Sequence, residues 1–190
     1  MSKKIMFNDK FGLTQAVLDG RKTMTRRISE DQIRNSIFCK SGYESIHGYE
    51  IKPKYKVGEV VAIAQSYESV YNEKGLETMD MLVSWLKNHK GWQNKLFVAA
   101  GYMIHHIRIT DIKIERLHDI SDEDCMKEGI IHAYTNNNGI KIYHTPHTKR
   151  GYLSTDVAQE AFAFLINKVS GKGTWESNPY VFVYEFKLID

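Results

Sequence analysis

The stretch from Tyr180 to Leu188 constrains the fold most, because it has the cleanest strand pattern in the chain. Aromatic residues occupy every second position and share one face: Tyr180, Phe182, Tyr184 and Phe186. A period of two residues is what a β-strand produces when its successive side chains point to opposite faces. A strand with such a face needs a sheet and a core to pack against. The pattern therefore predicts a strand that closes a sheet near the end of the chain.

Helical and strand patterns alternate through the rest of the chain, which predicts an α+β fold. Further strands are expected from Val57 to Tyr67, Lys95 to Tyr102 and His105 to Arg116. Helices are expected at about Lys10–Asp19, Leu76–Asn88, Ser121–Glu128 and Ala158–Val169. In the second of these, the helical spacing of Trp85 predicts a core position. A length of 190 residues, without an internal repeat or a low-complexity tract, suits a single domain that spans 1–190.

The segment from Gly20 to Arg27, GRKTMTRR, is the strongest candidate for a functional site. It holds Arg21, Lys22, Arg26 and Arg27 and no acidic residue. Gly20 follows an amphipathic helix at a position that favours a left-handed residue. Cations near a helix C-terminus often form a solvated surface that complements the helix dipole. Their density here favours the other interpretation, a site for an anion or a nucleotide.

A second signal is Glu128, at the end of the helix that begins at Ser121. Ser121 is a typical N-cap residue, three acids follow it in the first turn, and Gly129 ends the helix. A carboxylate in the last turn of a helix is disfavoured by the helix dipole. Glu128 is thus either an exposed residue with a mild penalty or a residue with a cationic partner, and we expect that partner to be Lys22.

The motif G-x-K-x-x-T-x-R, carried here by Gly20, Lys22, Thr25 and Arg27, resembles the signature of the ASCH family of PUA-like proteins. Three other segments resemble the family in the same order: Tyr55–Gln65, Ile107–Gly129 and Trp175–Phe186. The resemblance implies a mixed or antiparallel β-barrel flanked by helices. It also implies insertions at about 29–54, 70–94 and 134–152, as in larger, phage-type members.

The resemblance also implies a chemistry. Small ASCH amidohydrolases remove the acyl group of N4-acetylcytidine with a lysine, a threonine and a glutamate, which correspond here to Lys22, Thr25 and Glu128. A lysine beside arginines in a partly desolvated pocket has its charged form disfavoured and can act as a base. Where larger members carry an Arg-Glu pair, this chain has Ala64-Gln65, which weighs against catalysis.

Binding without turnover is the favoured alternative. The same cationic region would bind RNA, single-stranded nucleic acid or a modified nucleoside, with phosphates on arginines and a base stacked on an aromatic ring. Ribonuclease activity, which is associated with the family, is a third hypothesis. The expected nucleic-acid-binding residues are Arg21, Lys22, Arg26, Arg27, Gln65 and Tyr67.

Bulk composition excludes several other classes. A hydrophobic content of 42% supports a sizeable core, while a net charge of +3 is too mild to indicate nucleic-acid binding by itself. Cys39 and Cys125 lie outside any C-x-x-C pattern, so neither a disulfide framework nor a zinc site is expected. The adjacent His105 and His106 would point to opposite faces of a strand. We expect no metal, cofactor, membrane span or signal peptide. We expect a cytoplasmic location, and the sequence does not indicate the oligomeric state.

Overall fold

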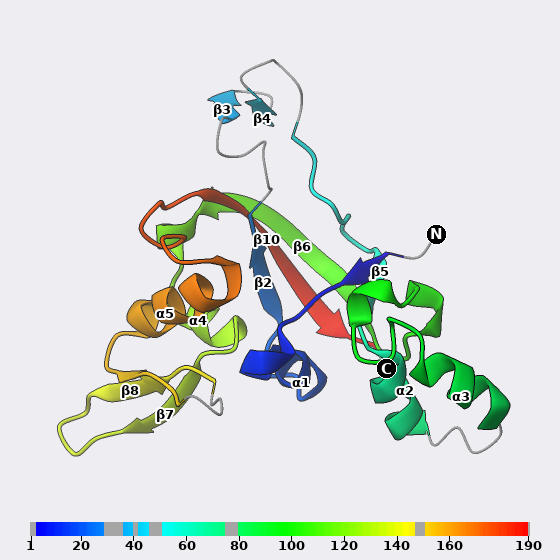
Figure 1. Ribbon diagram of the computed structural model, residues 1–190. Coiled ribbons are helices and arrows are strands. Elements are labelled where there is room, and N and C mark those ends of the chain that lie inside the picture. The colour runs from blue at the N-terminus through cyan, green and yellow to red at the C-terminus, as the bar shows by residue number, and fades with distance from the viewer. Residues whose placement is uncertain are drawn as a thin grey trace.

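A five-stranded mixed sheet forms the centre of the protein, as the computed structural model shows (Figure 1). The structure describes residues 3–28, 36–39, 42–45, 51–74, 80–146 and 151–189, with only the backbone for 36–39, 42–45 and 80–83. In spatial order the sheet contains β1 (Lys4–Ile5), β5 (Val60–Ile63), β6 (His106–Arg116), β10 (Tyr180–Leu188) and β2 (Met24–Arg27). β1 pairs with β5 in parallel, and the other pairs are antiparallel.

The pairing of β10 with β6 is the longest in the sheet. Its register runs from Tyr180 opposite Arg116 to Leu188 opposite Ile107, with an irregularity between Glu185 and Phe186. The strand expected from the aromatic alternation is thus confirmed. Both of its faces are buried along the middle, because Val181 and Val183 are covered as well as the aromatic residues. This burial makes β10 the central strand of the core.

The expected α+β class is confirmed, but the sheet does not close into a barrel within the described residues. β1 and β2 are its two edges and do not pair with each other. Both edges are short, two and four residues, which leaves few backbone groups for a closing ladder. The side chain of Arg27 instead donates a hydrogen bond to the backbone carbonyl of Met6, beyond the end of β1.

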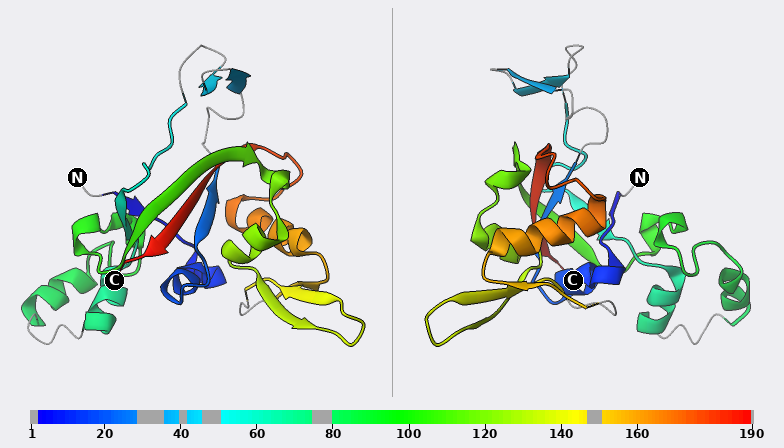
Figure 2. Two further views of the ribbon diagram at one scale, coloured as in Figure 1. Left: turned by 180° about the vertical axis from the view of Figure 1, so that it is seen from behind. Right: turned by 60° about the vertical axis from the view of Figure 1, so that its left-hand side comes forward.

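Helices and a second sheet flank the two ends of the central sheet (Figure 2). At one end lie two helices, α4 (Asp122–Lys127) and α5 (Ala158–Ser170), and a three-stranded sheet of β7 (Ile131–Thr135), β8 (Lys141–His144) and β9 (Ser154–Thr155). At the other end lie α2 (Tyr67–Lys74) and α3 (Asp80–Lys87). Short elements complete the chain: η1 (Asp9–Phe11), α1 (Leu13–Leu18), η2 (Lys95–Phe97), η3 (Ala100–Tyr102), η4 (Leu117–Asp119), and the hairpin of β3 (Ser36–Cys39) and β4 (Gly42–Ser45).

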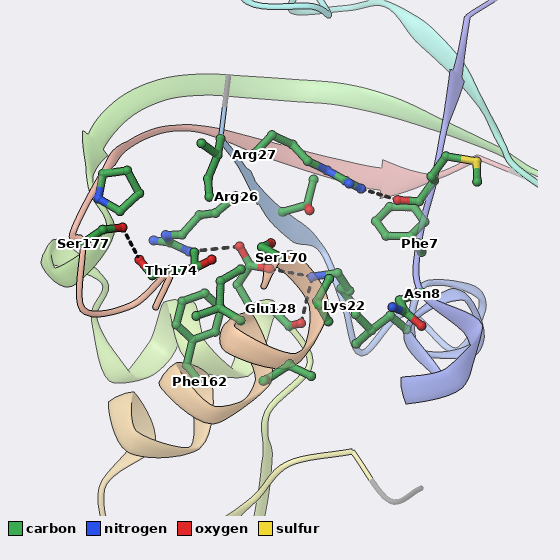
Figure 3. Close-up of a pocket in the computed structure, with 18 residues that line it drawn as sticks. Phe7, Asn8, Lys22, Arg26, Arg27, Glu128, Phe162, Ser170, Thr174 and Ser177 are labelled. Carbon is green, nitrogen blue, oxygen red and sulfur yellow. Dashed lines mark hydrogen bonds and ion pairs between the residues drawn. The ribbon is translucent and has the colours of Figure 1, made fainter. Parts of the chain in front are cut away.

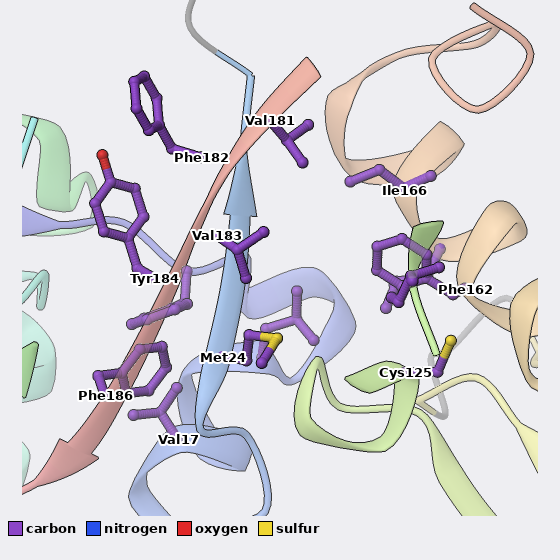
Figure 4. Close-up of a cluster of buried hydrophobic side chains, with 14 of the residues drawn as sticks. Val17, Met24, Cys125, Phe162, Ile166, Val181, Phe182, Val183, Tyr184 and Phe186 are labelled. Atoms are coloured by element: carbon purple, nitrogen blue, oxygen red, sulfur yellow. The ribbon is translucent and has the colours of Figure 1, made fainter. Parts of the chain in front are cut away.

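The core lies on both sides of β10 (Figure 4). Val181 and Val183 point toward Phe162 and Ile166 of α5, which carries the apolar stripe expected from the sequence. On the other side of the strand, Phe186 packs against Phe7, with ring centroids 5.6 Å apart. The core therefore fixes α5 and the start of the chain against the same central strand.

Three local expectations differ from the structure. Lys95–Tyr102, expected to be a strand, contains the two 3-10 helices η2 and η3. The helix expected at Lys10–Asp19 is divided into η1 and α1 at Gly12, which has a φ of 62°. Trp85, expected in the core, is 62% exposed.

The predicted limits of the three insertions stay a prediction, and part of the first, 29–54, lies outside the described residues. None of the described helices is long and apolar enough to span a membrane.

Candidate functional site

The turn after α1 directs Lys22 into the protein. Gly20 adopts a left-handed conformation with a φ of 71°, and the amide of Lys22 then donates to the carbonyl of Ala16 over 2.9 Å. The next amide, that of Thr23, donates to the carbonyl of Lys127 at the end of α4. This bond joins the start of β2 to the last turn of α4. The side chain of Lys22 is therefore placed beside Glu128.

Glu128 is positioned by the helix that the sequence predicted. The Ser121 hydroxyl accepts a hydrogen bond from the amide of Asp124, so α4 begins as expected, and Glu128 is its C-cap residue. Gly129 follows with a φ of 106°. A side chain at this position would be strained, and its Cβ would lie 3.4 Å from Leu13 and 3.8 Å from Cδ of Lys22. Glycine thus lets the chain turn close to Lys22.

Lys22 and Glu128 form a buried ion pair. The Nζ atom of Lys22 lies 2.6 Å from Oε2 of Glu128 and also donates to the Glu128 backbone carbonyl over 2.8 Å. Lys22 is 3% exposed and Glu128 is 5% exposed. The structure therefore brings together the two side chains that the sequence paired, and it gives the anomalous carboxylate its cationic partner.

Arg26 belongs to the same buried network. Its guanidinium contacts three carboxylates, at 2.5 Å from Glu115, 2.9 Å from Asp124 and 3.3 Å from Glu128. The side chain of Arg26 has no exposed surface. All three nitrogens of this guanidinium are thus engaged by carboxylates, so its role in the described structure is to hold β2, β6 and α4 together.

Arg27 has a different environment. It donates one hydrogen bond to the Met6 carbonyl, and its guanidinium carbon lies 5.6 Å from the centre of the Phe7 ring. Its Nε atom is buried and has no hydrogen-bond partner in the described part of the chain. A buried donor without a partner is costly, which marks it as a candidate contact for a ligand. Among the described residues Arg27 makes no ion pair with a carboxylate.

These side chains line a cavity of about 500 Å³, which we call the central cavity (Figure 3). Lys22 and Glu128 lie in its middle, with Asn8 and Phe7 toward one end and Thr174 and Ser177 toward the other. Thr25 is 4% exposed and also lines the cavity. α5 supplies one wall through Phe162, Leu165, Ile166, Val169 and Ser170. Lys22, Thr25 and Glu128, the expected catalytic residues, therefore face one space.

Three expected binding residues lie elsewhere and do not line this cavity. Arg21 is exposed, and its guanidinium is 2.8 Å from the carboxylate of Asp19. Gln65 is buried beyond β5, where it donates to Glu73 and accepts from the amide of Ile104. Tyr67 begins α2, with its ring against His89 and Tyr102. A nucleic-acid-binding role for these three stays a prediction without support from the cavity.

Sequence reasoning missed the polar residues that α5 and the following turn contribute to the cavity. These are Ser170, Thr174 and Ser177, and Asn8, at the start of η1, was missed as well. Glu115 and Asp124 were missed as partners of Arg26. Small hydroxyl residues after a helix are common in turns, so no signal in one sequence distinguishes these from ordinary turn residues.

Burial determines the ionisation of Lys22. Removal from water lowers the pKa of the Lys22 amine, and repulsion by Arg27 and Arg26 lowers it further, while Glu128 acts in the opposite direction. Arg21 does not contribute to the lowered pKa of Lys22, in contrast to the sequence interpretation.

The pKa of Asp124 is lowered too, because the hydrogen bonds from Arg26 and Lys113 outweigh desolvation. In the described part of the chain no cluster of at least three His, Cys, Asp or Glu side chains could hold a metal.

The fold and the site define an α+β protein with a buried, ion-paired polar cavity. No protein-family model and no curated protein matches the chain. One solved structure that resembles it is a protein of Enterococcus faecalis V583 described as family DUF984, which is 13% identical over 100% of this chain and 82% of that one, with a TM-score of 0.45. Another is the ASCH domain of Lactobacillus crispatus JV V101, 12% identical over 98% and 78%, with a TM-score of 0.41. The expected similarity to an ASCH domain is thus confirmed, and similarity at this level says nothing of what the chain binds.

Proposed function

We propose that the chain binds one nucleoside unit, of a nucleotide or of a nucleic acid, in the central cavity. The observation that carries this proposal is the buried Lys22–Glu128 pair that faces a cavity of about 500 Å³. Cavities of roughly 300–1,000 Å³ with a few fixed polar groups are typical of small-molecule sites. An ion pair kept out of water is weak evidence for stability, so a recognition role is the better explanation of its position.

The lining offers what a nucleobase requires. The carboxylate of Glu128 accepts hydrogen bonds, Lys22 donates them, and Asn8 does both. Phe7 and Phe162 supply apolar ring surface beside these groups. Arg26 is fully engaged by carboxylates, so it is not free to hold a phosphate. The chemistry of the central cavity thus favours the base and sugar over the charged backbone of a nucleic acid.

Calorimetric titration with cytidine, uridine, adenosine and N4-acetylcytidine tests this proposal. We expect saturable binding of at least one nucleoside, and a loss of affinity in Thr25→Val, which keeps the size of the side chain but removes its hydroxyl group. Thr110→Val is the matched control, because Thr110 is an exposed residue of β6 that does not line the cavity. Absence of binding by the intact protein, or equal losses in the two variants, would contradict the proposal.

A second candidate function is hydrolysis of an N-acyl group on a bound nucleoside. The lowered pKa of Lys22 favours it, because a neutral amine can accept a proton from the Thr25 hydroxyl or from water. Glu128 would position this amine, since it already contacts both Lys22 and Arg26. The activated oxygen would attack the acyl carbonyl, and Arg27 would stabilise the negative oxygen that forms there. As the C–N bond breaks, the Lys22 ammonium would return its proton to the leaving amino group, and an acyl group carried by Thr25 would be released as acetate by water.

Release of acetate from N4-acetylcytidine tests the second candidate. We expect release by the intact protein and none by Lys22→Met, in which the apolar chain keeps most of the volume and Glu128 retains Arg26. If N4-acetylcytidine binds and no acetate appears, the site binds without turnover, and only the second candidate is rejected.

A further inference from the structure

Two further cavities adjoin the central cavity and share lining residues with it. The first, of about 400 Å³, shares Met6, Arg27 and Ile28, and we call it the lysine cavity. Its other lining residues are Lys52, Lys54, Tyr55, Phe182 and Tyr184. The second, of about 540 Å³, shares Ser170, Thr174, Ser177 and Pro179, and we call it the Arg116 cavity. Arg116, Lys172, Gly173 and Tyr180 complete it.

The shared residues place the two flanking cavities at different ends of the central one. Arg27, which the lysine cavity shares, lies on the Phe7 side of Lys22, while Thr174 and Ser177 lie on the other side (Figure 3). The three cavities thus adjoin one another along one path, with the Lys22–Glu128 pair in the middle cavity. A ligand longer than one nucleoside would follow this path in both directions.

Charge separates the flanking cavities from the central one. Lys52, Lys54 and Arg27 line the lysine cavity, and Arg116 and Lys172 line the other. Within the described residues neither lining contains a carboxylate, whereas the lining of the central cavity contains Glu128. The path therefore has two positive ends and a charge-compensated middle.

Both positive ends rest on ordered aromatic residues. Tyr184 accepts a hydrogen bond from the amide of Lys54 over 2.9 Å, and its ring packs edge-on against Tyr55 at 5.2 Å. At the other end, the Arg116 guanidinium lies 3.8 Å from the centre of the Tyr180 ring and donates to the carbonyl of Asn178. These contacts hold cationic residues in place along the walls of the two cavities. Arg27, whose buried Nε has no hydrogen-bond partner among the described residues, lines both the central cavity and the lysine cavity.

From this arrangement we infer that the lysine cavity and the Arg116 cavity are two phosphate subsites, and that the ligand is an internal nucleotide of a single strand. This inference rests on the proposed binding of a nucleoside in the central cavity. The phosphates of an internal nucleotide leave the sugar from its 5′ and 3′ oxygens, so they extend to two sides of the nucleoside. A free nucleoside would leave both positive ends unused, and a mononucleotide would use one.

Titration with a graded set of ligands tests the inference: the preferred nucleoside, its 5′-monophosphate, its 3′-monophosphate, and a trinucleotide with that nucleoside in the middle. We expect each phosphate to add affinity, and the trinucleotide to bind about tenfold or more tightly than the nucleoside at low salt. Binding of one monophosphate as tightly as the trinucleotide would identify a mononucleotide ligand and reject the strand.

Paired variants assign the subsites. In Lys52→Ala/Lys54→Ala and in Arg116→Gln/Lys172→Gln, loss of one phosphate subsite should reduce the salt slope of trinucleotide binding by about 0.7, which is the contribution of one phosphate contact to a single strand. Nucleoside affinity should stay unchanged in both. Lys87→Ala/Lys141→Ala, which removes two exposed charges that line none of the three cavities, is the control and should leave the slope unchanged.

The outcomes separate this inference from the proposed function. If the nucleoside binds but phosphates add nothing, or if the control pair lowers the slope as much as the other pairs, the phosphate subsites are rejected and the central site stands. If neither the nucleoside nor the trinucleotide binds, both proposals fail together.

Discussion

Lys22 and Glu128 lie 106 positions apart in the chain, and their side chains meet with 2.6 Å between Nζ and Oε2. One residue follows α1 and the other ends α4, and the bond from Thr23 to the Lys127 carbonyl brings these segments together. The pair lies beside a cavity instead of inside a filled core. Two charged groups are thereby kept from bulk water in a place that a ligand can reach.

Removal of the Glu128 carboxylate should lower the stability of the protein strongly. Glu128→Ala leaves Lys22 without its partner in a buried position and takes one carboxylate from Arg26, so we expect the free energy of unfolding to fall by about 3–5 kcal/mol. The control is Glu59→Ala, which removes an ion pair with Lys3 whose side chain is 40% exposed, and should cost about 1 kcal/mol or less. Urea denaturation measures both. Equal costs would contradict the assignment of Glu128 to a buried network.

Substitution of the adjacent residues Arg26 and Arg27 should have different effects on stability and on ligand binding. Arg26→Met leaves Glu115, Asp124 and Glu128 without their shared cation, so we expect a large loss of stability, on the order of 3 kcal/mol or more. Arg27→Met leaves the carboxylate network intact and should be less destabilising, while it weakens nucleotide binding. Denaturation and titration on the same two variants measure the contrast. A stable Arg26→Met protein would show that the network contributes little to the fold.

The lowered pKa of Lys22 predicts a pH dependence of stability. Between the pKa of Lys22 in the folded protein and the ordinary value of 10.5, the unfolded chain binds the proton more than the folded chain does. Stability rises with pH wherever the unfolded state binds more protons. Relative to Lys22→Met, the wild-type protein should therefore gain stability as the pH rises toward 10.5. Denaturation of both proteins between about pH 7 and pH 10 measures the difference. A difference that is constant or falls would contradict the lowered pKa.

The thiol of Cys125 should be inert in the folded protein. Cys125 has no exposed surface, and burial raises the pKa of its thiol to about 12. The thiolate is the reactive form, so alkylation should require unfolding. In a Cys39→Ser background, which leaves Cys125 as the single cysteine of the chain, iodoacetamide should label the protein in urea but not in buffer. Rapid labelling in buffer would show that α4 opens easily.

Local signals in the sequence were sufficient for most elements that build the site. The alternation from Tyr180 predicted β10, the Ser121 cap and the following acids predicted α4, and Gly20 predicted the end of α1. Each of these signals acts over a few neighbouring residues. The dipole argument about Glu128 correctly required a cationic partner, and motif order indicated Lys22.

Other features depend on contacts between distant segments, and there the sequence was insufficient. The predicted barrel needs edge strands long enough to pair, but β1 and β2 are too short and stay apart. Trp85 has the periodicity of a core residue, yet it is 62% exposed and its ring lies beside that of His89. Four cations in one segment suggested one basic surface, but β2 sends Arg26 to a carboxylate network and Arg27 toward Met6.

By itself, the sequence determined the α+β class, the strand from Tyr180 to Leu188 and the caps, because propensities, periodicity and helix dipoles act locally; the pairing of Lys22 with Glu128 came from the resemblance in motif order. Only the tertiary structure decided which cations are neutralised, where the cavities lie and that the sheet of the described residues stays open. Those properties depend on which carboxylates and rings the fold brings within a few ångströms of each cation, and electrostatic and packing energies change steeply over that distance.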